Sequence, residues 1–131
     1  MLLPNSERAA VRHASRFRYT TFERFWVDYL LAHSNPKTAA FHVFGAALSV
    51  TAFAALVGCG EVFFAAFAVI PAQLFAAIGH WFTGEPDHVS PHRPDWAAVA
   101  SLRMLWLAMT GRLDTTVREA VAAQGGGASS Q

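Results

Sequence analysis

Residues 38–57 of the 131-residue chain read TAAFHVFGAALSVTAFAALV, twenty positions without a formal charge. An α-helix of about 20 apolar residues is long enough to cross the hydrocarbon core of a membrane. A second run, VFFAAFAVIPAQLFAAIGHWF at 62–82, is also uncharged, and only Gly58-Cys59-Gly60-Glu61 separates the two. This pattern predicts a transmembrane hairpin. We expect Pro71 to kink the second helix, because proline removes one backbone hydrogen bond.

The composition favours a membrane protein and excludes several other classes. Hydrophobic residues make up 53% of the sequence and charged residues 15%, well below the quarter that is usual in soluble domains. The net charge of +1 gives no basic surface for a nucleic acid. Cys59 is the single cysteine, so neither an internal disulfide nor a CxxC-type zinc or redox site can form. The start of the chain has no pattern of a cleavable signal peptide.

Amphipathic helices are expected on both sides of the hairpin. Thr20 and Glu23 fit a capping box that opens a helix of about a dozen residues, which is too short for a span and suits the headgroup region. Asn35 is the expected N-cap of the first apolar helix, which has Pro36 at its first position. After a loop over 83–95, Asp95 is the expected N-cap of a helix over 96–110. Arg103 in the middle of that helix favours an interfacial position over a third span.

These elements predict an all-α fold, a small helical membrane protein with a central transmembrane hairpin between interfacial helices. A polar, basic tail covers 1–18, the helical membrane domain covers 19–113, and 114–131 hold a short polar helix (114–123) and a flexible tail. All ten Lys and Arg residues lie outside the hairpin, so the positive-inside rule places both termini in the cytoplasm. High Ala and Arg content favours a bacterial inner membrane. The sequence is compatible with an oligomer.

Three histidines are predicted to meet at one end of this hairpin. His42 lies early in the first apolar run, His80 lies near the end of the second, and His33 ends the helix that precedes the hairpin. An imidazole inside an apolar run needs a partner. Three imidazoles at one level form a nitrogen set suited to Fe(II), Zn(II) or Cu. The following loop offers further groups that could complete the set, namely Glu85, Asp87, His88 and His92.

Two other interpretations of these histidines stay open. In one, the protein is not catalytic, and the histidines stabilise the fold or hold a structural zinc or a haem. In the other, the chain is a helical membrane adaptor in which the histidines do not converge. A structural zinc site would be four-coordinate and closed, whereas catalytic iron needs open positions.

Three stretches of the chain resemble the Mpo1-like family. They are FWVDYLLAHSNPKTAAFHVFG at 25–45, QLFAAIGH at 73–80 and WAAVASLRMLWLAMTGRL at 96–113, and together the resemblance covers about residues 22–113. A characterised member of that family is an Fe(II)-dependent dioxygenase that shortens 2-hydroxy fatty acids by one carbon in α-oxidation. The resemblance implies a helical membrane fold, a fatty-acyl substrate, O₂ as co-substrate, and His33, His42 and His80 as ligands of the iron.

One departure from the family pattern bears on the chemistry. The family commonly has a glutamate four residues after the histidine of its Gly-His motif, where this chain has Gly84. Glu85 as a catalytic group, or His88 as a metal ligand, would then have to substitute.

We also expect Arg103 to help hold the substrate carboxylate, and the acyl tail to lie along the Phe-rich surface of the hairpin.

Overall fold

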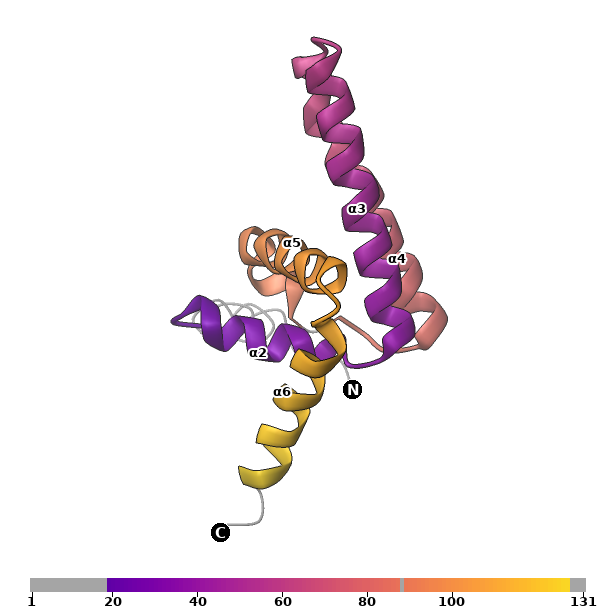
Figure 1. Ribbon diagram of the computed structural model, residues 1–131. Helices are drawn as coiled ribbons and strands as arrows, with labels where there is room; N and C mark the ends of the chain where they lie inside the picture. Colours follow the sequence, from indigo (N-terminus) through magenta and orange to yellow (C-terminus); the bar gives the residue numbers. More distant parts are fainter. Residues whose placement is uncertain (1–18, 88, 128–131) are drawn as a thin grey trace, which may run out of the picture.

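The computed structural model describes residues 19–87 and 89–127, and within these ranges the chain is helical, without strands (Figure 1). The elements, in chain order, are α2 (Phe22–Ala32), α3 (Pro36–Gly58), the 3-10 helix η1 (Val62–Val69), α4 (Ile70–Thr83), the short 3-10 helix η2 (Ser90–His92), α5 (Pro94–Met109) and α6 (Leu113–Gly127). The predicted fold class, a small helical membrane protein, is confirmed. The expected tail over 1–18, His88 and the last four residues lie outside the described ranges.

The hairpin is the longest feature of the molecule, and the end with its turn extends well beyond α2, α5 and α6 in Figure 1. Of the described helices, α3 (23 residues) and the continuous η1–α4 segment (22 residues) are long and apolar enough to cross a membrane, with mean hydropathies of 1.9 and 2.1. At about 1.5 Å per residue α3 is about 35 Å long, a little more than the ~30 Å hydrocarbon core. Only 17% of an 18-residue apolar stretch of each segment is buried inside the molecule, so most of its side chains are left to contact lipid.

The two arms of the hairpin approach each other closely at two glycines. A Cβ atom added at Gly45 would lie 2.8 Å from Cβ of Phe75, and one added at Gly79 would lie 2.8 Å from Cβ of Phe41. Small residues let helix backbones approach closely in membranes, where packing replaces the hydrophobic effect as the driving force. These two contacts therefore fix the distance between α3 and α4.

The second arm differs from the single kinked helix that the sequence predicted. It begins as the 3-10 helix η1, and α-helical geometry starts at Ile70, so that Pro71 stands in the first turn of α4. Proline is tolerated there because the first amides of a helix have no partner within it. The amide of Ala72 instead donates to Oγ of Ser49 on α3, at 2.9 Å. This bond satisfies a backbone donor at a depth where no water is available.

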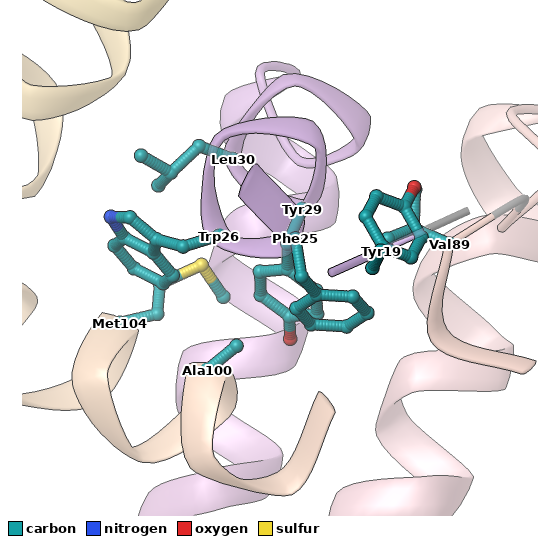
Figure 2. Close-up of a cluster of buried hydrophobic side chains, with 8 residues drawn as sticks. All are labelled: Tyr19, Phe25, Trp26, Tyr29, Leu30, Val89, Ala100 and Met104. Atoms are coloured by element: carbon teal, nitrogen blue, oxygen red, sulfur yellow. The ribbon is translucent and has the colours of Figure 1, made fainter. Parts of the chain in front are cut away.

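Beside one end of the hairpin, α2 and α5 pack together around a small hydrophobic core (Figure 2). The inner face of α2 supplies Phe25, Trp26, Tyr29 and Leu30, and α5 supplies Ala100 and Met104. The rings of Phe25 and Tyr29 stack with their centroids 5.9 Å apart. Figure 2 shows the side chains of α2 and α5 facing one another across this cluster. The core holds α2 in place, and α2 carries two residues of the site described below.

The helix ends confirm some predicted caps and correct others. Asn35 caps α3, with its side chain accepting from the amide of Lys37 at 3.0 Å, as predicted. Thr20 does not cap α2; Thr21 does, because its Oγ1 reaches the amide of Arg24 three residues on. Asp95 is not an N-cap either.

Pro94 already occupies the first position of α5, which suits its fixed φ, and Asp95 lies inside the first turn. The last helix is longer than the predicted 114–123, since α6 runs to Gly127. Residues 125–127, predicted as part of a tail, are therefore helical.

We expect Gly45→Leu to destabilise the hairpin by about 3 kcal/mol, because the new side chain overpacks against Phe75. Gly58→Leu is the matched control, since no atom lies within 4 Å of a Cβ added at Gly58. Thermal unfolding of the detergent-solubilised protein measures the difference. Equal melting temperatures for the two variants would show that the arms are not held by this contact.

Candidate metal centre

Three helices bring the three predicted histidines to one point. His33 is the C-cap of α2, His42 lies in the second turn of α3, and His80 lies in the last turn of α4. The Nε2 atom of His42 is 3.0 Å from Nε2 of His33 and 3.1 Å from Nε2 of His80. Of the described His, Cys, Asp and Glu side chains, these three form a group whose ligand atoms all lie within 4.8 Å of one another. The convergence predicted from the sequence is present.

The opposite nitrogen of each ring faces an oxygen atom of the protein. Nδ1 of His33 is 2.6 Å from the carbonyl oxygen of Tyr29, and Nδ1 of His80 is 2.7 Å from the carbonyl oxygen of Glu85. Nδ1 of His42 is 3.4 Å from the hydroxyl oxygen of Tyr29. Histidines that bind metals almost always donate their other N–H to such an oxygen, which fixes the tautomer and the ring orientation.

The protons on the ring nitrogens decide whether the contacts between the three Nε2 atoms are attractive or repulsive. A carbonyl oxygen can only accept, so His33 and His80 must each carry a proton on Nδ1. When neutral, both rings then present a bare lone pair at Nε2. His42 has at most one proton to donate from its own Nε2, yet two lone pairs face it at hydrogen-bond distance. At least one of the two N···N contacts is therefore repulsive unless a cation lies between the rings.

Distances and burial both fit a bound metal ion. Two nitrogens that each lie about 2.1 Å from a metal, at right angles, are about 3.0 Å apart, which matches the two short contacts. His33 is 0% and His42 6% exposed. Burial lowers the pKa of His33 below its usual value, against a smaller opposing effect of the Tyr29 carbonyl. The ring therefore stays in the neutral form that a metal ligand needs.

Asp87 adds a carboxylate to this group. Its Oδ1 accepts from the amides of Val89 and Ser90, at 3.0 and 2.9 Å, while Oδ2 lies 3.8 Å from Nε2 of His80. Burial by itself raises the pKa of Asp87, but the hydrogen bonds from Ser90 and Val89 outweigh it and leave the pKa below its usual value. The side chain is thus an anion beside the three imidazoles. The sequence placed Asp87 among several loop candidates, without a signal that separated it from its neighbours.

The other loop candidates lie elsewhere or cannot be described. The carboxylate of Glu85 is directed to Asn35 and Thr38, at 3.4 and 3.5 Å, and only its backbone carbonyl reaches His80. His92 is in η2 and outside the histidine group. His88 lies outside the described residues.

Arg103, expected near the substrate carboxylate, is engaged at a different place. Its Nη1 is 3.1 Å from Oε1 of Glu23, and its guanidinium carbon lies 4.6 Å from the centre of a Trp26 ring. Glu23, expected to close the capping box, is likewise used in this ion pair. The structure therefore does not bring Arg103 to the histidines.

Tyr29 connects the histidines to α5. Its hydroxyl is 2.8 Å from Oγ of Ser101 and 3.4 Å from Nδ1 of His42, and its ring stacks on His33 with centroids 4.2 Å apart. Burial raises the pKa of Tyr29 to about 12, so the hydroxyl keeps its proton. The arrangement that leaves Nε2 of His42 free for a metal has His42 donating to the Tyr29 oxygen and Tyr29 donating to Ser101.

A cavity of about 550 Å³ opens beside the cluster. Tyr29, His42, Asp87 and Ser101 line its polar end, and the rest of its wall is mainly alanine, valine and proline from α3, η1, α4 and α5. Ligand sites are typically apolar cavities of this size with a few convergent polar groups. Within the histidine cluster, His42 is therefore accessible from this cavity to a ligand with a polar head and an apolar tail.

Fold and site together define a small helical membrane protein with a candidate histidine metal centre. A family model described as 2-hydroxy-palmitic acid dioxygenase Mpo1-like matches residues 19–113. The chain thus belongs to the Mpo1-like family, and the resemblance found in its three motifs is confirmed. Comparisons with curated proteins and with solved structures found no match.

We expect Tyr29→Phe to weaken the binding of a divalent metal by about tenfold or more, since the oxygen that holds Nδ1 of His42 is lost. Tyr19→Phe removes a hydroxyl that bonds Asp28 instead and is the control. Competition against a chelator of known affinity measures both variants. An unchanged metal affinity in Tyr29→Phe would show that the Tyr29 hydroxyl does not contribute to metal binding.

Proposed function

We propose that this protein is an Fe(II)-dependent dioxygenase that shortens 2-hydroxy fatty acids by one carbon. The observation that carries the proposal is the set of three Nε2 atoms turned toward one point while each Nδ1 is held by an oxygen. The family's description, a dioxygenase of 2-hydroxy-palmitic acid, supplies the chemical class.

In this proposal His33, His42, His80 and Asp87 hold the iron. Neutral imidazoles and a carboxylate are the usual ligands of non-haem Fe(II) sites, which combine histidines with a carboxylate and leave positions open. The chain supplies such a donor set from α2, α3, α4 and the loop after α4. Cys59 lies at the opposite end of the hairpin, so thiolate ligation from this chain plays no part.

The overall reaction balances without a further reductant. A 2-hydroxy acid and one O₂ give the acid that is one carbon shorter, together with CO₂ and H₂O. Bound iron(II) supplies the activation of O₂ and a site at which the hydroxyl and carboxylate of the substrate can chelate.

The chain itself orients the substrate and keeps water out. Ser101 accepts from Tyr29, and its own hydroxyl proton stays available for a substrate oxygen at the polar end of the cavity. The high pKa of Tyr29 makes it a donor and excludes it as a base near neutral pH. Tyr29 and His33 are fully buried beside the apolar core around α2, which limits side reactions with water there.

The proposed function also agrees with the position expected for the site relative to the bilayer. His42 lies near the start of α3 and His80 in the last turn of α4, which is the end of the hairpin near which α2, α5 and α6 gather in Figure 1. We place this end in the headgroup region of the cytoplasmic face of a bacterial inner membrane, according to the distribution of Lys and Arg. A fatty acid in that leaflet would present its polar head at the height of the metal.

We expect the purified protein, loaded anaerobically with Fe(II), to bind about one iron per chain and to convert 2-hydroxypalmitate into the acid one carbon shorter. His42→Ala should lose both properties, because it removes the ring that contacts both other histidines. His92→Ala, outside the cluster, should keep both. Metal mass spectrometry and product analysis provide the readouts.

Two outcomes of that experiment would support the non-catalytic alternative. Tightly held zinc without turnover would indicate a structural metal site, and a Soret band would indicate haem. Iron binding and turnover that both survive His42→Ala would overturn the proposal itself.

Asp87 and Glu85 can be separated by paired neutral substitutions. We expect Asp87→Asn to lower iron affinity by about tenfold or more, because Oδ2 faces the imidazoles. Glu85→Gln should cost much less, since its carboxylate faces Asn35 and Thr38. Iron affinity measured by chelator competition distinguishes the two. The reverse order would make Glu85 the substitute for the family glutamate.

A further inference from the structure

We propose that the alanine-walled cavity between the hairpin and α5 is the binding site of the substrate's acyl tail and that its wall sets the accepted chain length. The proposal rests on the function proposed above for the head of the substrate. It assigns the tail a different place from the Phe-rich outer surface that the sequence suggested.

The cavity wall is built from helix stripes that begin at the histidines. On α3, Ala46, Val50 and Phe53 follow His42 in the cavity wall at intervals of three or four positions, and Ser49 stands beside them. On the second arm, the wall includes Ala76 and Ala72, four and eight positions before His80 on α4, and continues with Ala68 and Ala65 of η1 toward the turn. Residues at such spacing lie on one face of a helix. Two faces, one from each arm, therefore lead away from the metal centre in the same direction.

The depth of the cavity suits a membrane acyl chain. From His42 to Phe53 the helix rises about 16 Å, at about 1.5 Å per residue. This is about half of the ~30 Å hydrocarbon core, which is the share of one leaflet and hence of one lipid tail. A tail whose head is held at the histidines would thus reach the level of Phe53 or end close to it.

The small residues of the wall are not explained by helix packing alone. The close approach of α3 and α4 is made at Gly45 and Gly79, where an added Cβ would clash with Phe75 and Phe41. The alanines of the wall instead border a cavity of about 550 Å³ that no side chain of the described residues fills. Ser49 and Gln73 interrupt the apolar wall, and the Oγ of Ser49 already accepts the amide of Ala72.

The cavity has an entrance that faces lipid. In Figure 1, α5 lies against only part of the hairpin, and the arms continue beyond it without a neighbour. Phe53, five residues before the end of α3 at Gly58, lines the cavity and is 53% exposed. A fatty acid can therefore enter sideways from the bilayer with its tail remaining in an apolar environment throughout.

Crosslinking tests where the tail lies without requiring turnover. The probe is a 2-hydroxy fatty acid of sixteen carbons with a diazirine halfway along its tail, added without O₂ to the Fe(II)-loaded protein in lipid nanodiscs. We expect adducts on the cavity wall, near Val50 and Ala72, that excess 2-hydroxypalmitate suppresses. Adducts mainly on the outer surface, near Phe63 and Trp81, or adducts that 2-hydroxypalmitate leaves unchanged, would overturn the proposal.

Phenylalanine substitutions at two alanines of the wall test whether the wall limits the length of the accepted acyl chain. We expect Ala72→Phe to lower kcat/KM for 2-hydroxypalmitate by about tenfold or more relative to 2-hydroxyoctanoate, whose tail is half as long. Ala98→Phe, on the exposed wall of α5, should shift the preference in the same direction if Ala72→Phe fails to fold. Ala77→Phe, exposed and outside the cavity wall, is the matched control and should keep the ratio of the wild type.

The two hypotheses fail in different ways. A wild-type protein that converts neither acid contradicts the proposed function, whereas the crosslinking result still reports the position of the tail. A wild-type protein that converts 2-hydroxypalmitate, with the same preference in all three variants, contradicts the assignment of the cavity alone.

Discussion

The close contact between the two arms of the hairpin is the constraint on which the site depends. Gly45 and Gly79 leave no room for a side chain, so α3 and α4 approach until backbone and ring atoms touch. Gly45 lies one turn from His42, and Gly79 directly precedes His80. Wider spacing at these two glycines would separate the Nε2 atoms, which now lie 3.1 Å apart. Helix packing and metal-site geometry are thus set by the same residues.

The third imidazole reaches the same point through a different kind of interaction. α2 is held by a hydrophobic core that includes Phe25 and Met104, and His33 follows as its C-cap. Tyr29 serves both purposes, since its ring is buried in that core while its carbonyl and hydroxyl each face a histidine. The interfacial helices are therefore part of the candidate site. Without α2 the hairpin alone would supply two nitrogens.

The sequence was most informative where a residue's chemistry conflicts with its surroundings. His42 and His80 stand in uncharged runs where an imidazole needs a partner, so their convergence could be predicted from the hairpin alone. Asn35 and Pro36 likewise carry a local signal that defines the start of α3. These predictions rest on local rules and on one simple topology.

Other features depend on contacts that no local pattern encodes. Asp87 is one of four candidate ligands in the loop, and only the fold of the loop turns its Oδ2 toward His80. Arg103 looked free to bind a carboxylate until α2 placed Glu23 beside it. The choice of Thr21 over Thr20 as N-cap shows the usual one-residue uncertainty of helix ends. The cavity arises between the hairpin and α5, so its shape could not be predicted before these elements were placed relative to one another.

The 3-10 geometry of η1 bears on how the substrate range of this family member can change by mutation. With three residues per turn, side chains three apart are eclipsed, so Ala65 and Ala68, which both line the cavity, stand in a straight column instead of winding around the axis. A larger residue at one of these positions would shorten the space at one defined depth and leave the levels below untouched. Because this column is remote from the histidines, single substitutions in it would change the range of accepted substrates. The chemistry at the other end of the hairpin would be preserved.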